Sequence, residues 1–286
     1  HTVVWTFRLP IATFALLVGA SLGLAGAEMQ TILDNPLASP YTLGVSAAAG
    51  FGAALAIVFG AVIPGWAATL AIPAGAFIFA MLSALAIWAV ARFRRGATDT
   101  IILCGVALFF LFSSALAFLQ YIATENQLQA IVFWMFGSLQ GATWPKLAVV
   151  AAMLLVAVPF LAAQAWKLTA LRLGDDRARS LGINVQRIRL QTLVLTSMLT
   201  AIAVCFAGSI GFIGLVAPHL ARMMVGEDQR YFMPMSALIG ALLLSAASIA
   251  TKTVIPGSIF PIGIATAAIG VPFFAAMVLG KRRAYW

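Results

Sequence analysis

Charged side chains are scarce in this 286-residue chain: 9% of its residues are Asp, Glu, Lys or Arg, whereas 63% are hydrophobic. A soluble domain is usually about 25% charged and about 45–50% apolar. Acidic residues are the scarcest, with eight against 17 basic ones. This balance excludes an ordinary soluble enzyme. It indicates a multi-pass membrane protein, in which a basic excess marks cytoplasmic loops rather than nucleic-acid binding.

Cysteine and histidine are also rare, with two of each. Cys104 and Cys205 stand in apolar runs without a CxxC spacing, so neither a zinc site nor a redox pair is expected. His219 has no other histidine nearby, which favours packing over metal binding. The chain contains no HExxH or GxSxG motif. We therefore expect no catalytic residue, no metal site and no cofactor bound by this chain.

The apolar runs predict an all-α, polytopic bundle with about nine membrane spans, because about 20 apolar residues cross a bilayer as a helix. One span covers Leu9 to about Leu33. The charge-free run Asn35–Ala91 fits two, broken at Ile63–Trp66, where Pro and Gly end helices. A short surface helix is expected within residues 125–144. The other spans are expected over 101–121, 147–166, 190–221 (two spans, broken at Ala207–Gly211), 231–251 and 253–280.

The positions of Lys and Arg predict the orientation. Clusters at 92–95, 167–189 and 281–283 are expected on the cytoplasmic side. An even number of spans must therefore separate them, which is why the 190–221 run is divided in two. Fourteen of the 17 basic residues then face inward, and Arg8, Lys146 and Lys252 face outward. Because residue 1 would also lie outside, we expect one further span before this sequence.

One polar segment, LRLGDDRARSLGINVQRIRLQ (171–191), interrupts the apolar runs with two acids and five arginines. Gly174 would end one helix, and Asp175 would cap the next. Gly182 fits a left-handed stop, and Asn184 would cap a second short helix that leads back into the membrane. The pattern fits either an ordinary solvated loop or a compact helix–Gly–helix unit that receives force from a soluble partner.

Five stretches together carry a resemblance to a known family. LGDDRARSLGINVQRIR (173–189) is similar to its coupling loop. Residues 8–54, 208–222, 226–244 and 261–283 are similar, in order, to its RLP…MQ…NPLA, G.I.F.GL..PH..R, G.DHR and P.G..TA..G.PFF motifs. The chain thus resembles the FecCD-type permeases, the membrane subunits of type II ABC importers for iron–siderophore complexes, haem or cobalamin, along nearly its whole length.

The resemblance implies one transmembrane permease domain over 1–286, with cytoplasmic coupling helices at 171–190. Family members have ten spans, so the first would be absent here. It also implies a multi-pass protein of the bacterial inner membrane, surrounded by lipid. Its partners would be a second permease chain, identical or paralogous, two ATPase subunits that bind ATP and Mg, and a periplasmic binding protein. Arg8 and Lys252 would dock that binding protein, and nucleic acid is not expected as a partner.

The resemblance assigns two further sets of residues on the cytoplasmic side. Asn35, Leu37, Thr98 and Asp99 would form the cytoplasmic gate. Gln229 stands where the family has His, so the packing there is expected to differ in detail. The residues that would enter a groove of the ATPase are Gly174, Asp175, Asp176, Arg177, Ala178, Arg179, Ser180, Leu181 and Gly182.

Glu28 leaves an alternative open, because it is the one acid well inside an apolar run. It is either functional, as intramembrane acids usually are, or it pairs with an arginine or reaches the interface. A secondary transporter would use such an acid within inverted repeats, but no repeat between the two halves is visible. An intramembrane enzyme would need a catalytic motif or a pair of acids within a span, and the sequence has neither.

Overall fold

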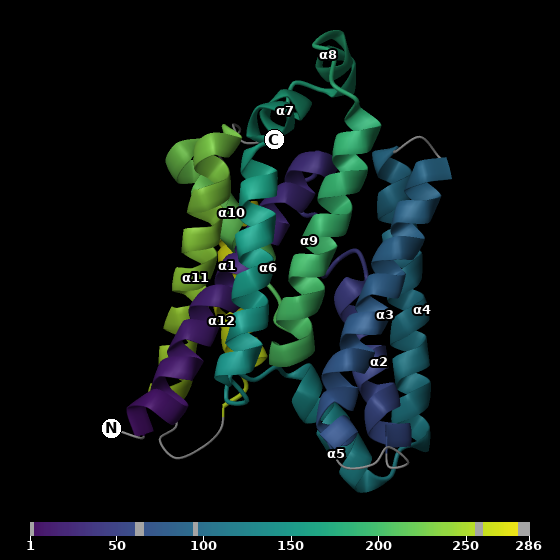
Figure 1. The fold of residues 1–286 in the computed structure, drawn as a ribbon, viewed down its shortest axis with the longest axis vertical. Helices are drawn as coiled ribbons and strands as arrows, with labels where there is room; N and C mark the ends of the chain where they lie inside the picture. The colour runs from purple at the N-terminus through teal and green to yellow at the C-terminus, as the bar shows by residue number, and fades with distance from the viewer. Residues whose placement is uncertain (1–2, 61–65, 94–96, 255–259, 280–286) are drawn as a thin grey trace.

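The computed structural model describes residues 3–60, 66–93, 97–254 and 260–279, and every regular element in these ranges is a helix (Figure 1). The predicted all-α class is therefore confirmed. The elements are η1 (a π-helix, Val4–Arg8), α1 (Leu9–Leu33), α2 (Val45–Phe59), α3 (Trp66–Phe93), α4 (Thr98–Ile122), α5 (Glu125–Met135), α6 (Trp144–Ala162), α7 (Ala165–Leu171), α8 (Asp175–Ser180), α9 (Val185–Ala207), α10 (Ile213–Val225), α11 (Gln229–Val254) and α12 (Ile262–Leu279).

Six of the described helical segments are long and apolar enough to cross a membrane: η1 with α1, and then α3, α4, α6, α9 and α11. Three shorter apolar helices, α2, α10 and α12, lie where the sequence predicts the remaining spans. The chain is thus a polytopic helical membrane protein. The count of nine spans depends on the three short helices and stays a prediction.

The structure confirms the predicted break within the 190–221 run. α9 ends at Ala207, Gly208 adopts φ 74°, and α10 begins at Ile213. α5 is the short helix expected within residues 125–144, and α6 follows it after a short connection. The break predicted at Ile63–Trp66 falls mainly on residues outside the described ranges, with α2 and α3 on either side of it.

α1 is the central helix of the bundle. It packs most extensively against α11 and also contacts α9, α10 and α6. Its apolar side chains Phe14, Leu24, Met29 and Ile32 are almost fully buried. α1 and α9 are the most buried of the six long segments, whereas α4 is the least buried and leaves most of its surface open. The end of α1 is therefore held by protein on nearly all sides.

Glycine lets α1 approach its neighbours closely. A Cβ on Gly26 would lie 1.9 Å from the carbonyl oxygen of Gly214 in α10. A Cβ on Gly19 would lie 2.3 Å from the carbonyl oxygen of Gly240 in α11. These are contacts between backbones, as expected for membrane helices that associate through small residues. No larger residue fits at these crossings unless the helices move apart.

The two ends of the bundle differ in the number of charged residues that they carry. α7 and α8 project from one end, here called the polar end, whereas the N-terminus and α5 lie at the other, here called the N-terminal end (Figure 1). Arg8, Lys146 and Lys252 stand at helix termini at the N-terminal end. The other described basic residues belong to the polar end, and they are Arg92, Lys167, Arg172, Arg177, Arg179, Arg187, Arg189, Arg222 and Arg230.

Gly26→Val is expected to destabilise the folded chain by about 1–3 kcal/mol or more, because the added methyl groups would meet backbone atoms of Gly214 that cannot move aside. Gly50→Ala is the matched control, since a Cβ there would meet only side-chain atoms, the nearest at 3.6 Å. SDS-induced unfolding in mixed micelles, followed by circular dichroism, measures both variants. Equal stability of the two would contradict the close crossing of α1 and α10.

Candidate functional site

The polar segment, residues 171–191, lies at the polar end and contains the connection from α7 to α9 and the first turns of α9. Gly174 (φ 97°) and Gly182 (φ 78°) flank the short helix α8. Glycine adopts such positive φ values without the steric strain of a side chain. Within α8 only Ala178 is fully buried, and most of the other side chains face solvent. The predicted compact helix between two glycines is confirmed.

Two details of the predicted segment are wrong. Asn184 accepts a hydrogen bond from the backbone N–H of Arg187 at 2.9 Å, but the helix that it caps is α9 itself, not a separate short helix. Helical geometry continues because nothing in the following residues interrupts it. Asp175 does not cap α8 either: Gly174 holds the N-cap position, and Asp175 is the first helical residue.

Asp175 instead pairs with the buried guanidinium of Arg189. The two Oδ atoms of Asp175 accept hydrogen bonds from the two Nη atoms of Arg189 at 2.9 and 3.2 Å. Nε of Arg189 donates to the carbonyl oxygen of Ile32 at 2.7 Å. Ile32 lies in the last turn of α1, where carbonyls lack a donor within the helix. One arginine of α9 therefore joins the first residue of α8 to the end of α1.

The outer face of α8 carries exposed charges. Arg179 pairs with Asp176 at 3.0 Å and more loosely with Asp175 at 3.4 Å. Such pairs within one exposed helix contribute little to stability. Arg177, Ser180 and Leu181 also face solvent. The predicted contact residues of this segment thus form an exposed, structured projection, with Ala178 as its buried base.

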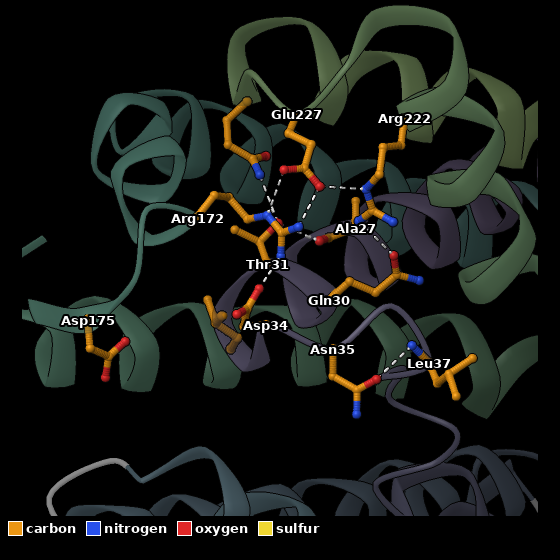
Figure 2. Close-up of polar contacts among 12 residues, drawn as sticks. Ala27, Gln30, Thr31, Asp34, Asn35, Leu37, Arg172, Asp175, Arg222 and Glu227 are labelled. Carbon is orange, nitrogen blue, oxygen red and sulfur yellow. Dashed lines mark hydrogen bonds and ion pairs between the residues drawn. The ribbon is translucent and has the colours of Figure 1, made fainter. Parts of the chain in front are cut away.

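A second junction lies between α1, α7 and the α10–α11 connection (Figure 2). Arg172, the C-cap of α7, forms ion pairs with Asp34 and Glu227. Glu227 also pairs with Nε of Arg222 at 3.0 Å, and Nη2 of Arg222 donates to Oε1 of Gln30 at 3.1 Å. These five side chains connect three segments that are far apart in the sequence. The bonds that Arg172 donates to Asp34 and Glu227 are charge-assisted hydrogen bonds, which are stronger than neutral ones.

Gln229 reinforces this junction. Its backbone N–H donates to Oγ1 of Thr169 in α7 at 3.0 Å, and its side-chain amide donates to Oγ1 of Thr31 in α1 at 2.8 Å. Gln229 lies between Asp228 and Arg230, which form an exposed ion pair, and the hydrogen bonds from Arg230 lower the pKa of Asp228. Glutamine at position 229 therefore has a defined structural role, where the family resemblance expected histidine.

The end of α1 is shaped by residues that follow it. Asp34 adopts left-handed backbone (φ 46°, ψ 42°), and the N–H of Asn35 reaches back to the carbonyl of Gln30 at 3.2 Å. This is the Schellman arrangement, with aspartate in the position that glycine usually holds. Oδ1 of Asn35 then accepts from the N–H of Leu37 at 2.9 Å. The chain leaves the helix in a defined direction, and the side chain of Leu37 is half exposed.

The expected gate residues lie on two separate elements. Asn35 and Leu37 belong to the loop after α1, whereas Thr98 and Asp99 form the first turn of α4. Neither of the last two residues caps α4, because Ala97 is the N-cap and no side chain accepts a capping bond there. Among the described residues no hydrogen bond or ion pair joins the two sets. The loop contacts α4 farther along, where Leu43 packs against Gly105.

The two expected docking residues lie at the N-terminal end. Arg8 is the last residue of η1, and Lys252 stands in the last turn of α11, which packs alongside α1. Both side chains are exposed. Lys146, the third basic residue at this end, is engaged locally, because its Nζ donates to the carbonyl oxygen of Gly141 at 2.7 Å. Arg8 and Lys252 therefore occupy the end opposite the polar segment, as predicted.

Glu28 is fully buried in α1, so the expectation that it reaches the interface is wrong. Neither of its carboxylate oxygens has a hydrogen-bond partner among the described residues, and no arginine there pairs with it. Burial without a partner is costly for a polar group. The same part of the chain holds no group of His, Cys, Asp and Glu side chains that could bind a metal ion.

Reasoning from sequence missed the junction around Arg172. Asp34, Arg172 and Glu227 each follow the end of an apolar helix on the predicted cytoplasmic side. That shared position is a signal that they lie at one depth. It does not say which acid meets which arginine, since the pairing depends on how α1, α7 and α10 pack around one another.

The bundle of apolar helices with an exposed, charged helix at one end is that of a polytopic membrane protein, and the class to which it belongs is that of membrane transport permeases. The chain belongs to the FecCD transport family, whose pattern matches residues 1–280.

Three curated relatives illustrate the family. The permease protein MJ0087 of Methanocaldococcus jannaschii, which is assigned to ABC transporters, is 40% identical, over 98% of this chain and 82% of the relative. The hemin transport system permease protein HmuU of Yersinia pestis is 36% identical, over 98% and 84%. The vitamin B12 import system permease protein BtuC of Citrobacter koseri is also 36% identical, over 98% and 84%.

Solved structures agree with this assignment. A structure assigned to the metal-chelate type of ABC transporter, in an inward-facing conformation, has a TM-score of 0.89 and 34% identity. That match covers 97% of this chain and 87% of the other. The PsaBC structure from Streptococcus pneumoniae in complex with Fab shares the fold alone, with a TM-score of 0.64, 14% identity and coverage of 97% and 94%.

Asp175→Asn is expected to loosen α8, because it removes the charge that pairs with Arg189. A hydrogen bond to a charged group contributes about 1.5–3 kcal/mol. Since the Asp175 side chain is 36% exposed, we expect the lower end, a rise of about tenfold in trypsin cleavage after Arg177 and Arg179. Asp176→Asn is the matched control, since that carboxylate is 99% exposed and pairs with Arg179. Equal cleavage rates in the two variants would contradict the anchoring role of Asp175.

Proposed function

We propose that this chain is the permease subunit of an ABC importer in the bacterial inner membrane. The observation that carries the proposal is the polar segment, an exposed helix held between two glycines and anchored to α1 through Arg189. A loop held in this way can pass the motion of a soluble partner to the membrane helices. The partners proposed are two ATPase subunits, which would bind ATP and Mg, with residues 174–182 as their contact.

The proposed assembly contains a second permease chain, identical or paralogous, and a periplasmic substrate-binding protein. Arg8 and Lys252 would meet acidic groups of the binding protein, because they present positive charge at the end opposite the ATPases. Asn35, Leu37, Thr98 and Asp99 would narrow the pathway near the cytoplasm. Among the described residues no hydrogen bond or ion pair joins Asn35 and Leu37 to Thr98 and Asp99, and the proposed gate closes between two chains around their common axis.

The substrate proposed is an iron–siderophore complex or a related metal chelate. The support is the family and the relatives, which carry hemin, vitamin B12 and metal-chelate transport in their names. The alternative is a secondary transporter not coupled to ATP, in which the buried carboxyl of Glu28 would bind the coupling ion. Dependence of uptake on ATP separates the two, since an ion-coupled transporter would respond to an ionophore instead.

Replacing Asp175, Arg177 and Arg179 together by Ala is expected to reduce ATP-driven uptake to background. The replacement removes both the anchor and the exposed charges of α8. Uptake of radiolabelled ferric siderophore, haem and cobalamin into vesicles that contain the co-expressed ATPase and binding protein measures the effect and ranks the substrates.

The matched control for that experiment is Asp228→Ala with Arg230→Ala, which removes an exposed ion pair from the same end of the bundle but outside the polar segment. This control should transport as the unmutated chain does. Uptake by the triple variant at the unmutated rate would overturn the assigned contact. Ionophore-sensitive uptake without ATP would favour the secondary transporter.

Arg8→Glu and Lys252→Glu are each expected to weaken docking of the binding protein by about 0.2–1 kcal/mol, the usual range for an exposed ion pair. The double variant should lose more, and rising salt should weaken docking of the unmutated chain in the same direction. Lys146→Glu is the control, because Lys146 lies at the same end but is bonded to Gly141. Surface plasmon resonance on nanodiscs measures all four. Salt-independent docking would contradict the proposal.

A further inference from the structure

Arginines near the two ends of the polar segment both bind the C-terminal end of α1, but in different ways. At its C-terminal end, Arg189 is 5% exposed and bonds the carbonyl of Ile32. At its N-terminal end, Arg172 is 20% exposed and pairs with Asp34. Asp34 is itself 69% exposed. The contact made by Arg189 is thus buried in the protein, whereas the Arg172–Asp34 pair is accessible to solvent.

The difference in burial gives the two ties different properties. A buried ion pair that loses one partner leaves an uncompensated charge in the interior. We therefore expect the bonds of Arg189 to Ile32 and Asp175 to stay intact. An exposed pair is weak and can break and reform. Arg172 also divides its donors between Asp34 and Glu227, since Nε and Nη2 both face Glu227 while Nη1 faces Asp34. Arg172 can therefore release Asp34 without losing its hold on the α10–α11 connection.

Asp34 directs the chain that follows it. It is one of two described residues other than glycine with positive φ, and Asn35 and Leu37 follow through the bond that joins them. Aspartate tolerates this backbone better than most residues, yet it remains uncommon there. The ion pair with Arg172 holds Asp34 at that position from outside α1. A displacement of Arg172 therefore acts directly on Asp34, the residue that begins the loop.

We propose that Arg172 is a positioning residue that sets the conformation of the 34–37 loop through Asp34, so that movement of the polar segment moves this loop. The inference rests on the proposed function, because it takes the polar segment as the part that the ATPases move. Arg189 then keeps the polar segment bound to the end of α1, while the Arg172–Asp34 pair breaks and reforms. Among the described residues no hydrogen bond or ion pair joins residues 35 and 37 to the polar segment, and the Arg172–Asp34 pair is the ion pair that reaches the residue next to them.

A reporter at position 37 tests the proposal. Leu37→Cys in a Cys104→Ala/Cys205→Ala background places a single thiol on a half-exposed position whose side chain makes no hydrogen bond. The chain is co-expressed with its ATPase subunit and prepared as inside-out vesicles. The rate of labelling by a membrane-impermeant maleimide is measured without nucleotide and after trapping with ATP and vanadate. The ratio of the two rates reports movement of the loop.

Arg172→Gln and Asp34→Asn remove the pair from either side. Asn keeps the shape of Asp and accepts left-handed backbone, so the loop is not lost for steric reasons. In the unmutated chain the labelling ratio should differ from unity by about fivefold or more, the usual lower range for coupling between sites. In either variant it should fall to within about twofold of unity. The double variant should equal the singles, because both substitutions break one link.

Two controls separate positioning from a general loss of structure. Arg230→Gln removes an arginine at the start of α11, beside the same connection, but the partner of Arg230 is Asp228 and not a residue at the end of α1, so this variant should keep the unmutated ratio. Arg172→Lys keeps the positive charge, so its labelling ratio should lie between those of Arg172→Gln and the unmutated chain. Basal ATP hydrolysis and co-purification of the ATPase should not change in Arg172→Gln or Asp34→Asn, whereas a merely structural role would lower both.

The unmutated ratio in Arg172→Gln or Asp34→Asn would overturn the inference, as would a loss of the ratio in Arg230→Gln. If the unmutated chain shows ATP-driven uptake but no nucleotide dependence at position 37, the inference fails while the proposed function stands. If the unmutated chain shows no ATP-driven uptake at all, the proposed function fails first, and the inference fails with it.

Discussion

The buried guanidinium of Arg189 holds the polar end of the molecule together. It satisfies a carbonyl at the end of α1, where the helix has no donor of its own, and it takes Asp175 as its counter-ion. Removal of a buried counter-ion is more damaging than its presence is stabilising. The start of α8, the start of α9 and the end of α1 are therefore held in one arrangement. The projection that carries the proposed ATPase contact depends on that arrangement.

The close packing of α1 gives this arrangement a fixed base. Its glycines meet the backbones of α10 and α11 directly, so the helix can neither rotate nor slide without collisions. Motion at the polar end must then occur beyond Leu33, in the loop that begins at Asp34. The same constraint explains why charged residues gather at the helix ends. In the interior a polar group has no water to bind and needs a partner from the protein. Glu28 is an exception, because neither of its carboxylate oxygens has a hydrogen-bond partner among the described residues.

The proposed function depends on the contrast between the packed helix bundle and the exposed Arg172–Asp34 pair. Closely packed helices move as one body, so they can transmit a displacement. The exposed Arg172–Asp34 pair can break and reform, which allows the loop after α1 to change its conformation. The family relationship identifies the chain as a transport permease, and the geometry indicates where a partner could act on it. The exposed, basic N-terminal end and the structured polar end lie at opposite extremes of the long axis (Figure 1). That separation suits a protein that receives substrate at one end and energy at the other.

The sequence by itself determined the class, the helix order and the identity of the polar segment. Composition and run length are sufficient for these, since a membrane span needs only about 20 apolar residues. Local rules also placed Gly182 and a helix cap at Asn184 correctly, although the helix that begins there is α9 itself and not a separate short helix. They failed at Asp175, which pairs with Arg189 fourteen positions away instead of capping its own helix. They also gave no sign that Arg172 meets Asp34, because capping and periodicity describe neighbours in the chain. Only the tertiary packing of α1, α7, α9 and α10 decided which charges came together. In a chain with so few charges, those pairings determine how the polar end is held.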